Sequence, residues 1–157
     1  MRRLLSSGLI VLAGAVGPGA LSPHQSYRPH VSDHRSDPRL ETLRHFFQRF
    51  ECPAEAYAVE FLEAADAYQL DWRLLPSISF VESSGGKATA NNNMFGWDQG
   101  HARFSSLTAG IYEVGYRLAY SEPYKDKNLD TVLTIYNPVG PYARAVKSVM
   151  RQIAPVQ

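Results

Sequence analysis

The chain has 157 residues, of which 45% are hydrophobic and 20% are charged, and its formal net charge is +1. These values fit one globular domain with a substantial core. Without a basic stripe, they argue against nucleic acid or another polyanion as a partner. Cys52 is the only cysteine, which excludes an intramolecular disulfide and a thiolate metal cluster.

Residues 1–20 are typical of a signal peptide. A basic start at Arg2-Arg3 precedes a mostly apolar run over residues 4–16, and residues 13–15 offer a cleavage site of small residues. The run is too short for a stable membrane span, and the alternative is an uncleaved interfacial anchor. We therefore expect a secreted bacterial protein of the periplasm or cell wall, with no integral membrane span after signal cleavage.

Residues 21–36 mix proline, serine, histidine and charge without periodicity, which predicts a flexible linker. His24, His30 and His34 with Asp33 are conceivable metal ligands, but their spacing matches no standard site. We expect a solvated tether here and no metal ion. The folded domain is predicted to span residues 37–157.

Hydrophobic residues at helical spacing predict about six helices after this linker. Asp37-Pro38 marks the start of the first helix, because proline suits the first helical position, and Cys52-Pro53 ends it. The apolar faces run from Leu40 to Phe50, Tyr57 to Ala65, Leu74 to Val81, Leu107 to Leu118, Leu129 to Tyr136 and Tyr142 to Ile153.

One β-like region interrupts the helices. Residues 93–97 and 101–104, joined by a turn at Asp98-Gln99-Gly100, predict one small β-hairpin. Ser105 or Ser106 would then cap the next helix. The predicted fold class is mostly α, an α+β arrangement of about six helices with one hairpin.

Glu82 is the candidate for chemistry. Asp71 predicts the start of its helix, Pro76 favours a late start or a kink, and Ser84-Gly85-Gly86 ends the helix just after Glu82. The carbonyl end of a helix disfavours a carboxylate, and apolar neighbours raise a carboxyl pKa further. A carboxyl group that stays protonated near neutral pH suits a general acid. The alternative is an exposed, idle glutamate.

Three short motifs in order resemble the lysozyme-like superfamily, over residues 54–153. Val81-Glu82-Ser83 is similar to the Glu-Ser signature of soluble lytic transglycosylases, and Tyr136-Asn137 with Tyr142 and Val146 resembles their Tyr-Asn segment. Residues 92–96, Asn-Asn-Met-Phe-Gly, instead resemble the Asn-Asn-(Leu)-Phe-Gly motif of bacterial glucosaminidase domains in autolysins. Phe95-Gly96-Trp97 stands where the transglycosylases have Gly-Leu-Met-Gln.

The resemblance implies a lysozyme-like fold whose helices and hairpin border an active-site groove. Glu82 would be the catalytic acid, and Tyr136 would orient it or stabilise the developing positive charge. Substrate-binding roles would fall on the following residues: Ser83, Asn92, Asn93, Phe95, Trp97 and Asn137. Core positions remain the alternative for Tyr136, and for Tyr142 the core is preferred. Phe95 also fits an anchor beneath the hairpin.

The resemblance implies an endo-β-N-acetylglucosaminidase-like enzyme that cleaves β-1,4 bonds of peptidoglycan or a related N-acetylhexosamine polysaccharide. If Asp98 faces Glu82 across the groove, a second carboxylate supports hydrolysis. If Asp98 only forms the turn, Glu82 acts alone and the product is an anhydro-sugar, as in a lytic transglycosylase. A non-catalytic cell-wall-binding module and a helical interaction module are the further alternatives. We expect a monomer without a cofactor or metal.

Overall fold

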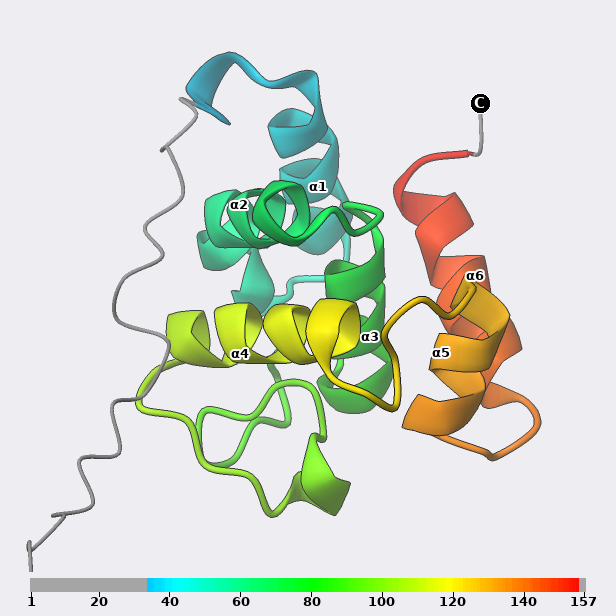
Figure 1. Ribbon diagram of the computed structural model, residues 1–157. Helices are drawn as coiled ribbons and strands as arrows, with labels where there is room; N and C mark the ends of the chain where they lie inside the picture. The colour runs from blue at the N-terminus through cyan, green and yellow to red at the C-terminus, as the bar shows by residue number, and fades with distance from the viewer. Residues whose placement is uncertain (1–33, 156–157) are drawn as a thin grey trace, which may run out of the picture.

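A computed structural model of the chain describes residues 34–155. This part is mostly helical with six α-helices, as predicted (Figure 1). The helices are α1 Pro38–Arg49, α2 Ala58–Tyr68, α3 Leu74–Ser83, α4 Leu107–Tyr120, α5 Leu129–Tyr136 and α6 Tyr142–Ile153. The predicted signal peptide and most of the predicted linker lie outside the described residues.

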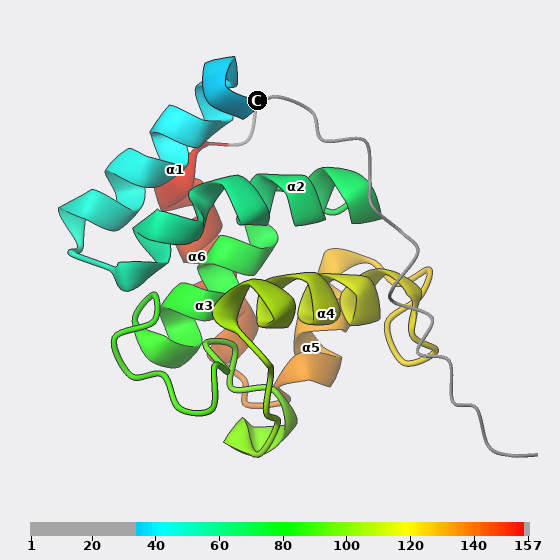
Figure 2. The same cartoon turned by 90° about the vertical axis from the view of Figure 1, so that its left-hand side faces the viewer.

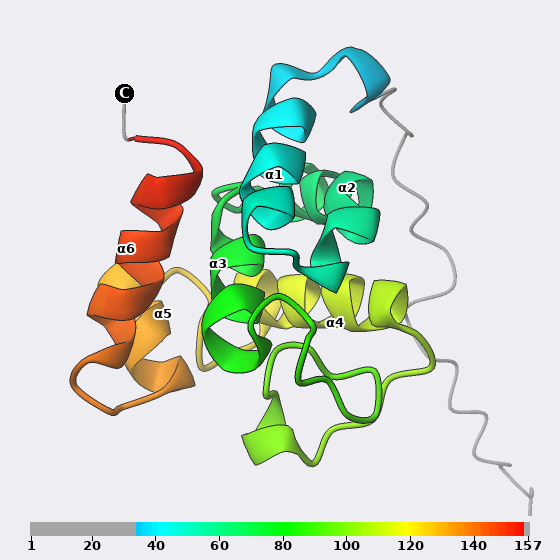
Figure 3. The same cartoon turned by 180° about the vertical axis from the view of Figure 1, so that it is seen from behind.

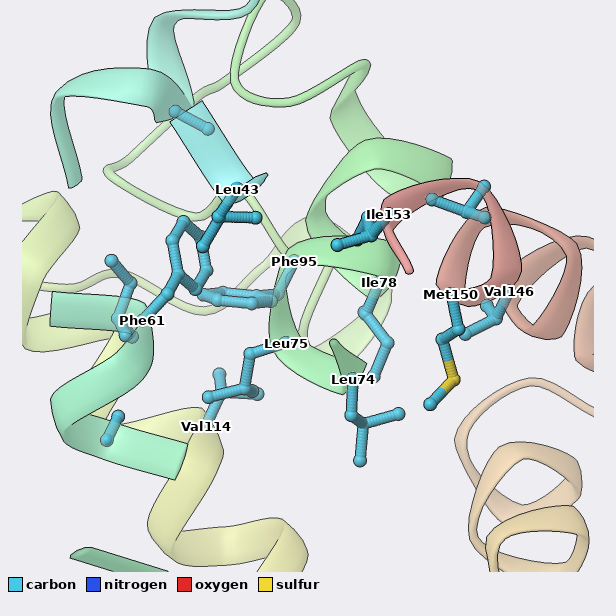
Figure 4. Packing of buried hydrophobic residues seen from close by; sticks show 14 of the residues in the cluster. Leu43, Phe61, Leu74, Leu75, Ile78, Phe95, Val114, Val146, Met150 and Ile153 are labelled. Atoms are coloured by element: carbon cyan, nitrogen blue, oxygen red, sulfur yellow. The ribbon is translucent and has the colours of Figure 1, made fainter. Parts of the chain in front are cut away.

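The α3 helix lies at the centre of the fold. Figure 3 shows α1 and α2 on one side of α3, and α5 and α6 on the other. In the core, Leu75 lies toward Phe61 and Val114, whereas Ile78 lies toward the α6 residues Val146 and Met150 (Figure 4). Leu75 and Ile78 are both 0% exposed. Because helices cover α3 on both sides, the end of α3 that carries Glu82 has a defined position.

Two helix starts follow the predicted capping residues, whereas the N-cap of α3 is Arg73 and not the predicted Asp71, whose side chain accepts a hydrogen bond of 2.9 Å from the Arg73 amide. The Asp37 side chain accepts a hydrogen bond of 2.8 Å from the Arg39 amide, with Pro38 as the first residue of α1. The Ser106 hydroxyl accepts a hydrogen bond of 3.0 Å from the Ala109 amide at the start of α4. The predicted second helix is divided, because a 3-10 helix at Pro53–Tyr57 precedes α2.

The α3 helix begins at Leu74, so Pro76 lies in its first turn and the predicted late start is confirmed. At its other end, Ser84 adopts the left-handed conformation with φ 53° and ψ 46°, although glycine is the usual residue there. Gly85 follows with φ 64°, and its carbonyl accepts a hydrogen bond of 2.9 Å from the Ala54 amide. The turn after α3 therefore packs against the start of the Pro53–Tyr57 helix.

The predicted β-hairpin is wrong. Residues 34–155 contain no β-strand, only an isolated bridge between Ala90 and Asn93. The Asn93 amide group donates to the carbonyls of Trp97 (2.9 Å) and Ala102 (3.3 Å), where a ladder would have used backbone groups. Left-handed backbone at Gly96, with a φ of 61°, also prevents an extended strand over residues 93–97.

The segment between α3 and α4, residues 84–106, is consequently an irregular loop. A 3-10 helix at Asp98–Gly100 replaces the hairpin turn. Figure 2 shows the loop beneath α3 and α4. The loop therefore borders the same side of the helices as the end of α3.

The last residues of the predicted linker are folded. His34–Ser36 form a 3-10 helix, and His34 is only 5% exposed. Its Nε2 lies 3.0 Å from Asp66 Oδ2 on α2. Arg39 contacts Asp66 at 2.8 Å and Asp37 at 2.6 Å. The folded domain thus includes residues before the predicted boundary at 37.

We predict that Gly85→Ala destabilises the fold. A Cβ at Gly85 would lie 2.7 Å from both Cβ and Sγ of Cys52, at a φ of +64°. The clash and the left-handed backbone together should reduce the free energy of unfolding by about 2–4 kcal/mol, measured by urea denaturation. Gly140→Ala is the matched control, because no atom lies within 4 Å of its added Cβ. Equal effects of the two substitutions would contradict the packing at Gly85.

Candidate active site

Glu82 lies in the last turn of α3 with its carboxyl group against the loop backbone. A Cβ at Gly96 would lie 2.5 Å from Glu82 Oε2, so the site requires glycine there, and its φ of +61° also favours glycine. Burial raises the pKa of Glu82, and the Tyr142 hydroxyl partly opposes this by lowering it. The direction of the pKa shift agrees with the sequence prediction, since burial favours the protonated carboxyl.

The side chains of Ser83, Tyr136 and Glu82 contact three successive residues of the loop. The Ser83 hydroxyl is 2.7 Å from the Met94 carbonyl, and the Tyr136 hydroxyl donates to the Phe95 carbonyl at 2.5 Å. Gly96, the next residue, lies directly against the Glu82 carboxyl. The Met94-Phe95-Gly96 segment therefore has a fixed position relative to the end of α3.

Two tyrosines lie behind Glu82. The rings of Tyr136 and Tyr142 are stacked, with centroids 5.9 Å apart and an interplanar angle of 5°. The Tyr136 hydroxyl is occupied by the Phe95 carbonyl. The Tyr142 hydroxyl is buried without a hydrogen bond of ordinary geometry among the described residues, and it lies close enough to lower the Glu82 pKa. Tyr136 was expected to place its hydroxyl beside Glu82. The hydroxyl that lowers the Glu82 pKa is instead that of Tyr142.

The burial of both tyrosines has an electrostatic consequence. Desolvation raises the pKa of Tyr136 and of Tyr142, and the nearby Glu82 charge raises both further. Both phenols consequently stay protonated across the pH range in which Glu82 titrates. They can act as neutral hydrogen-bonding groups but not as bases.

The Glu82 side chain lines a groove with a volume of about 1230 Å³. The groove lies between α4, the loop of residues 84–106 and the end of α5. It brings together five of the predicted site residues: Glu82, Trp97, Asp98, Tyr136 and Asn137. The Trp97 ring contacts the rings of Tyr136 and Tyr124, with centroid distances of 5.5 and 5.9 Å. One wall of the groove is therefore aromatic.

Asp98 and Asn137 line this groove through local turns. Asp98 is exposed and has a positive φ of 52° in the 3-10 helix. Asn137 uses its Oδ1 to accept a hydrogen bond of 3.1 Å from the Val139 amide. Burial and Tyr142 account for the Glu82 pKa shift, with no contribution from a carboxylate among the described residues. Asp98 is thus an exposed residue of the groove lining.

Four predicted substrate contacts are not in the groove. Ser83, Asn93 and Phe95 are 4%, 5% and 0% exposed, because the first two hold the loop by hydrogen bonds and Phe95 belongs to the core. Asn92 is exposed, but its side-chain amide donates to the Phe104 carbonyl at 2.9 Å and does not line the groove. For these residues the motif encodes the loop, Phe95 is the buried anchor that was its alternative, and substrate binding by the four stays a prediction.

The sequence analysis missed the wall that α4 contributes. Ala109, Glu113 and Arg117 line the groove at intervals of four residues. Arg117 Nε is 2.7 Å from Glu113 Oε1, and its guanidinium lies 5.8 Å from the Trp97 ring centroid. The four-residue spacing of polar residues opposite the apolar face of this helix was a usable signal. Only tertiary packing, however, directs that face to Glu82.

One cluster among residues 34–155 has the composition of a metal site. His34, Asp37 and Asp66 each place a ligand atom within 4.8 Å of the others. Arg39 already donates hydrogen bonds to both carboxylates, and these bonds lower the pKa of each. The Arg39 guanidinium therefore already compensates the negative charge of the two carboxylates.

Comparison of the chain with protein-family models and with curated proteins gives no significant match. In residues 34–155, no helix has both the length and the apolar character needed to cross a membrane.

We predict that Tyr142→Phe raises the pKa of Glu82 further. The hydroxyl lowers this pKa in the native protein, and phenylalanine keeps the ring stack while removing the hydroxyl. Titration of the glutamate carboxyl carbons by ¹³C NMR measures the shift. Tyr124→Phe is the control, because Tyr124 lines the groove but does not contribute to the Glu82 shift. An unchanged Glu82 pKa in Tyr142→Phe would exclude this interaction.

We also predict a pH-dependent stabilisation by Glu82→Gln. Because the folded pKa of Glu82 is raised above the ordinary glutamate value of 4.5, ionisation of Glu82 destabilises the fold as the pH rises through the folded pKa. The variant should therefore have the higher free energy of unfolding at neutral pH, and the difference should vanish below pH 4.5.

Urea denaturation at several pH values measures this difference. Glu122→Gln, which removes an exposed carboxylate from the loop after α4, is the control for the loss of one charge. A lower stability of Glu82→Gln at neutral pH would contradict a destabilising carboxylate at this position.

Proposed function

We propose that this chain is an exported glycosidase that cleaves β-1,4 bonds of an N-acetylhexosamine polysaccharide such as peptidoglycan, with Glu82 as the general acid. The observation that carries the proposal is a half-buried carboxyl group that lines an open groove and whose pKa is raised by burial. The lysozyme-like motifs of the sequence support the same assignment. Export is inferred from the signal-peptide pattern of residues 1–20.

The protonation of Glu82 supports the first chemical step. Glycosidic cleavage needs a proton on the leaving oxygen and stabilisation of an oxocarbenium-like sugar. A carboxyl group whose pKa is raised by burial keeps its proton nearer to neutral pH and can deliver it. Proton transfer leaves Glu82 as a carboxylate, and in a route without a second carboxylate Glu82 then accepts the proton of the incoming hydroxyl.

The groove suits a neutral polysaccharide. With Glu82 protonated, the groove is lined by two acidic residues, Asp98 and Glu113, and by two basic residues, Arg103 and Arg117, so their formal charges cancel. The aromatic wall of Trp97, Tyr124 and Tyr136 offers flat apolar surfaces with polar edges. Such surfaces match the apolar faces and hydroxyl groups of pyranose rings.

The second step has two candidate routes. Hydrolysis requires a base for water, and Asp98 and Glu113 both line the groove. In a retaining hydrolase the carboxyl groups are about 5–5.5 Å apart, and inverting enzymes separate them by about 6.5–9.5 Å. The separation between Glu82 and whichever of these carboxylates activates the water therefore decides between retention and inversion.

Lytic transglycosylation is the second candidate, and it needs no second carboxylate. If Glu82 has no carboxylate partner, it serves as acid and then as base, and the 6-hydroxyl of the sugar replaces water. The product then carries an anhydro-sugar end.

We predict that the full-length protein releases muropeptides from purified peptidoglycan and that Glu82→Gln does not. Glutamine preserves the side-chain shape but has no proton to donate, and loss of general acid catalysis reduces turnover by about 10²–10⁴-fold. Mass spectrometry of the products distinguishes reducing ends, which indicate hydrolysis, from anhydro-sugar ends. Asp98→Asn and Glu113→Gln are the matched variants for the second step.

The variants separate the two routes. Strong loss of activity in Asp98→Asn or Glu113→Gln, together with reducing ends, supports hydrolysis with that residue as the base. Anhydro-sugar ends with both variants active support transglycosylation. Release of no product by the parent protein, with polysaccharide binding intact, would contradict an enzyme and favour a cell-wall-binding module.

A further inference from the structure

A row of tyrosines lies on α4 beside the groove. Tyr112, Tyr116 and Tyr120 are spaced four residues apart and form this tyrosine row. Tyr116 is 37% exposed and Tyr120 is 47% exposed, whereas Tyr68 of α2 is only 9% exposed. The Tyr68 ring contacts all three, with centroid distances of 6.5, 6.0 and 6.0 Å. Tyr112 is half-buried, so Tyr116 and Tyr120 form the exposed aromatic surface of the row, and the buried Tyr68 ring supports it.

The support beneath this row is built into the packing of α2 and α4. A Cβ at Gly115 would lie 2.9 Å from Tyr68 Cδ2, so glycine gives the Tyr68 ring room under α4. The Tyr112 hydroxyl donates to Glu63 Oε2 at 2.5 Å. The Tyr116 and Tyr120 rings also contact each other at 5.3 Å. Because the rings are held before any ligand arrives, a ligand that stacks on them loses little additional conformational entropy.

The tyrosine row is continuous with the groove. Tyr112 belongs to both, since it also lines the groove. Glu113 and Arg117 line the groove, and on α4 they directly follow Tyr112 and Tyr116. At 3.6 residues per turn, the row and the Glu113–Arg117 pair are neighbouring stripes of one helix. A chain lying in the groove and crossing α4 would therefore meet Tyr116 and Tyr120.

We propose that the tyrosine row is a second binding surface for the same glycan strand, one that holds sugar units beyond those in the groove. This inference rests on the proposed function, because the ligand is the same neutral polysaccharide. Tyrosine provides a rigid, amphipathic ring at a low entropic cost, which suits a pyranose chain. The exposed groups of the row are phenol rings and hydroxyls without formal charge, in agreement with a neutral ligand.

The test measures binding without turnover. The full chain carrying Glu82→Gln is titrated by calorimetry with long glycan strands freed of peptide and with a short chito-oligosaccharide that fills only the groove. The same titrations are repeated with Tyr116→Ala/Tyr120→Ala added. We expect affinity for the long strands to fall about tenfold while affinity for the short oligosaccharide is unchanged.

Two further variants control for the fold and for ring chemistry. Tyr116→Phe/Tyr120→Phe keeps the ring faces and should retain most of the affinity for long strands. Ile135→Ser removes a comparably exposed apolar side chain from α5, where Ile135 is 40% exposed, and should leave long-strand affinity unchanged. Circular dichroism confirms that each variant is folded.

The outcomes distinguish this inference from the proposed function. Equal long-strand affinity of the parent and the double alanine variant, with groove binding intact, overturns the tyrosine row alone. Absence of binding to either ligand overturns the proposed function and this inference with it. A concentration-dependent dimer in analytical ultracentrifugation that the alanine variant abolishes assigns the row to self-association and overturns the glycan surface.

Discussion

The contact between Glu82 and Gly96 determines the geometry of the groove. It joins the last turn of the central helix α3 to a loop that has no regular structure of its own. Ser83 and Tyr136 hold the carbonyls of Met94 and Phe95, and the Glu82 carboxyl covers the next residue. The loop backbone makes no β-ladder, so side-chain contacts position Trp97 and Asp98 in the groove.

The same contact leaves a carboxyl group in an environment that is unfavourable for its charge. Burial raises the pKa of Glu82, and the Tyr142 hydroxyl compensates only in part. A purely structural position would accommodate a neutral side chain at lower cost in stability. Local conflicts of this kind are expected at functional sites. The stacked pair of Tyr136 and Tyr142 reduces the conflict, since their polar edges reach the loop carbonyl and Glu82 while their rings pack together.

The sequence predicted the helices and the position of Glu82 well, because helical periodicity, capping residues and helix breakers are local signals. It predicted the loop poorly. Asn93 and Phe95 were placed in a hairpin that borders the groove, yet the Asn93 amide replaces the ladder and the Phe95 ring enters the core. A single sequence does not reveal whether a polar or aromatic loop residue contacts a ligand or the protein itself. Tyr142 was assigned to the core and its ring does lie there, but the sequence did not reveal that its hydroxyl lies close to Glu82.

The sequence by itself determined six helices and a glutamate at the end of the third, since these follow from residue spacing along the chain. Tertiary structure alone decided which side chains surround that glutamate. Glu113 and Arg117 reach the groove because α4 packs against α2, and Gly96 reaches Glu82 because the loop folds back on α3. These proximities depend on packing between segments distant in sequence, whereas helix formation and capping depend on residues within one turn of each other.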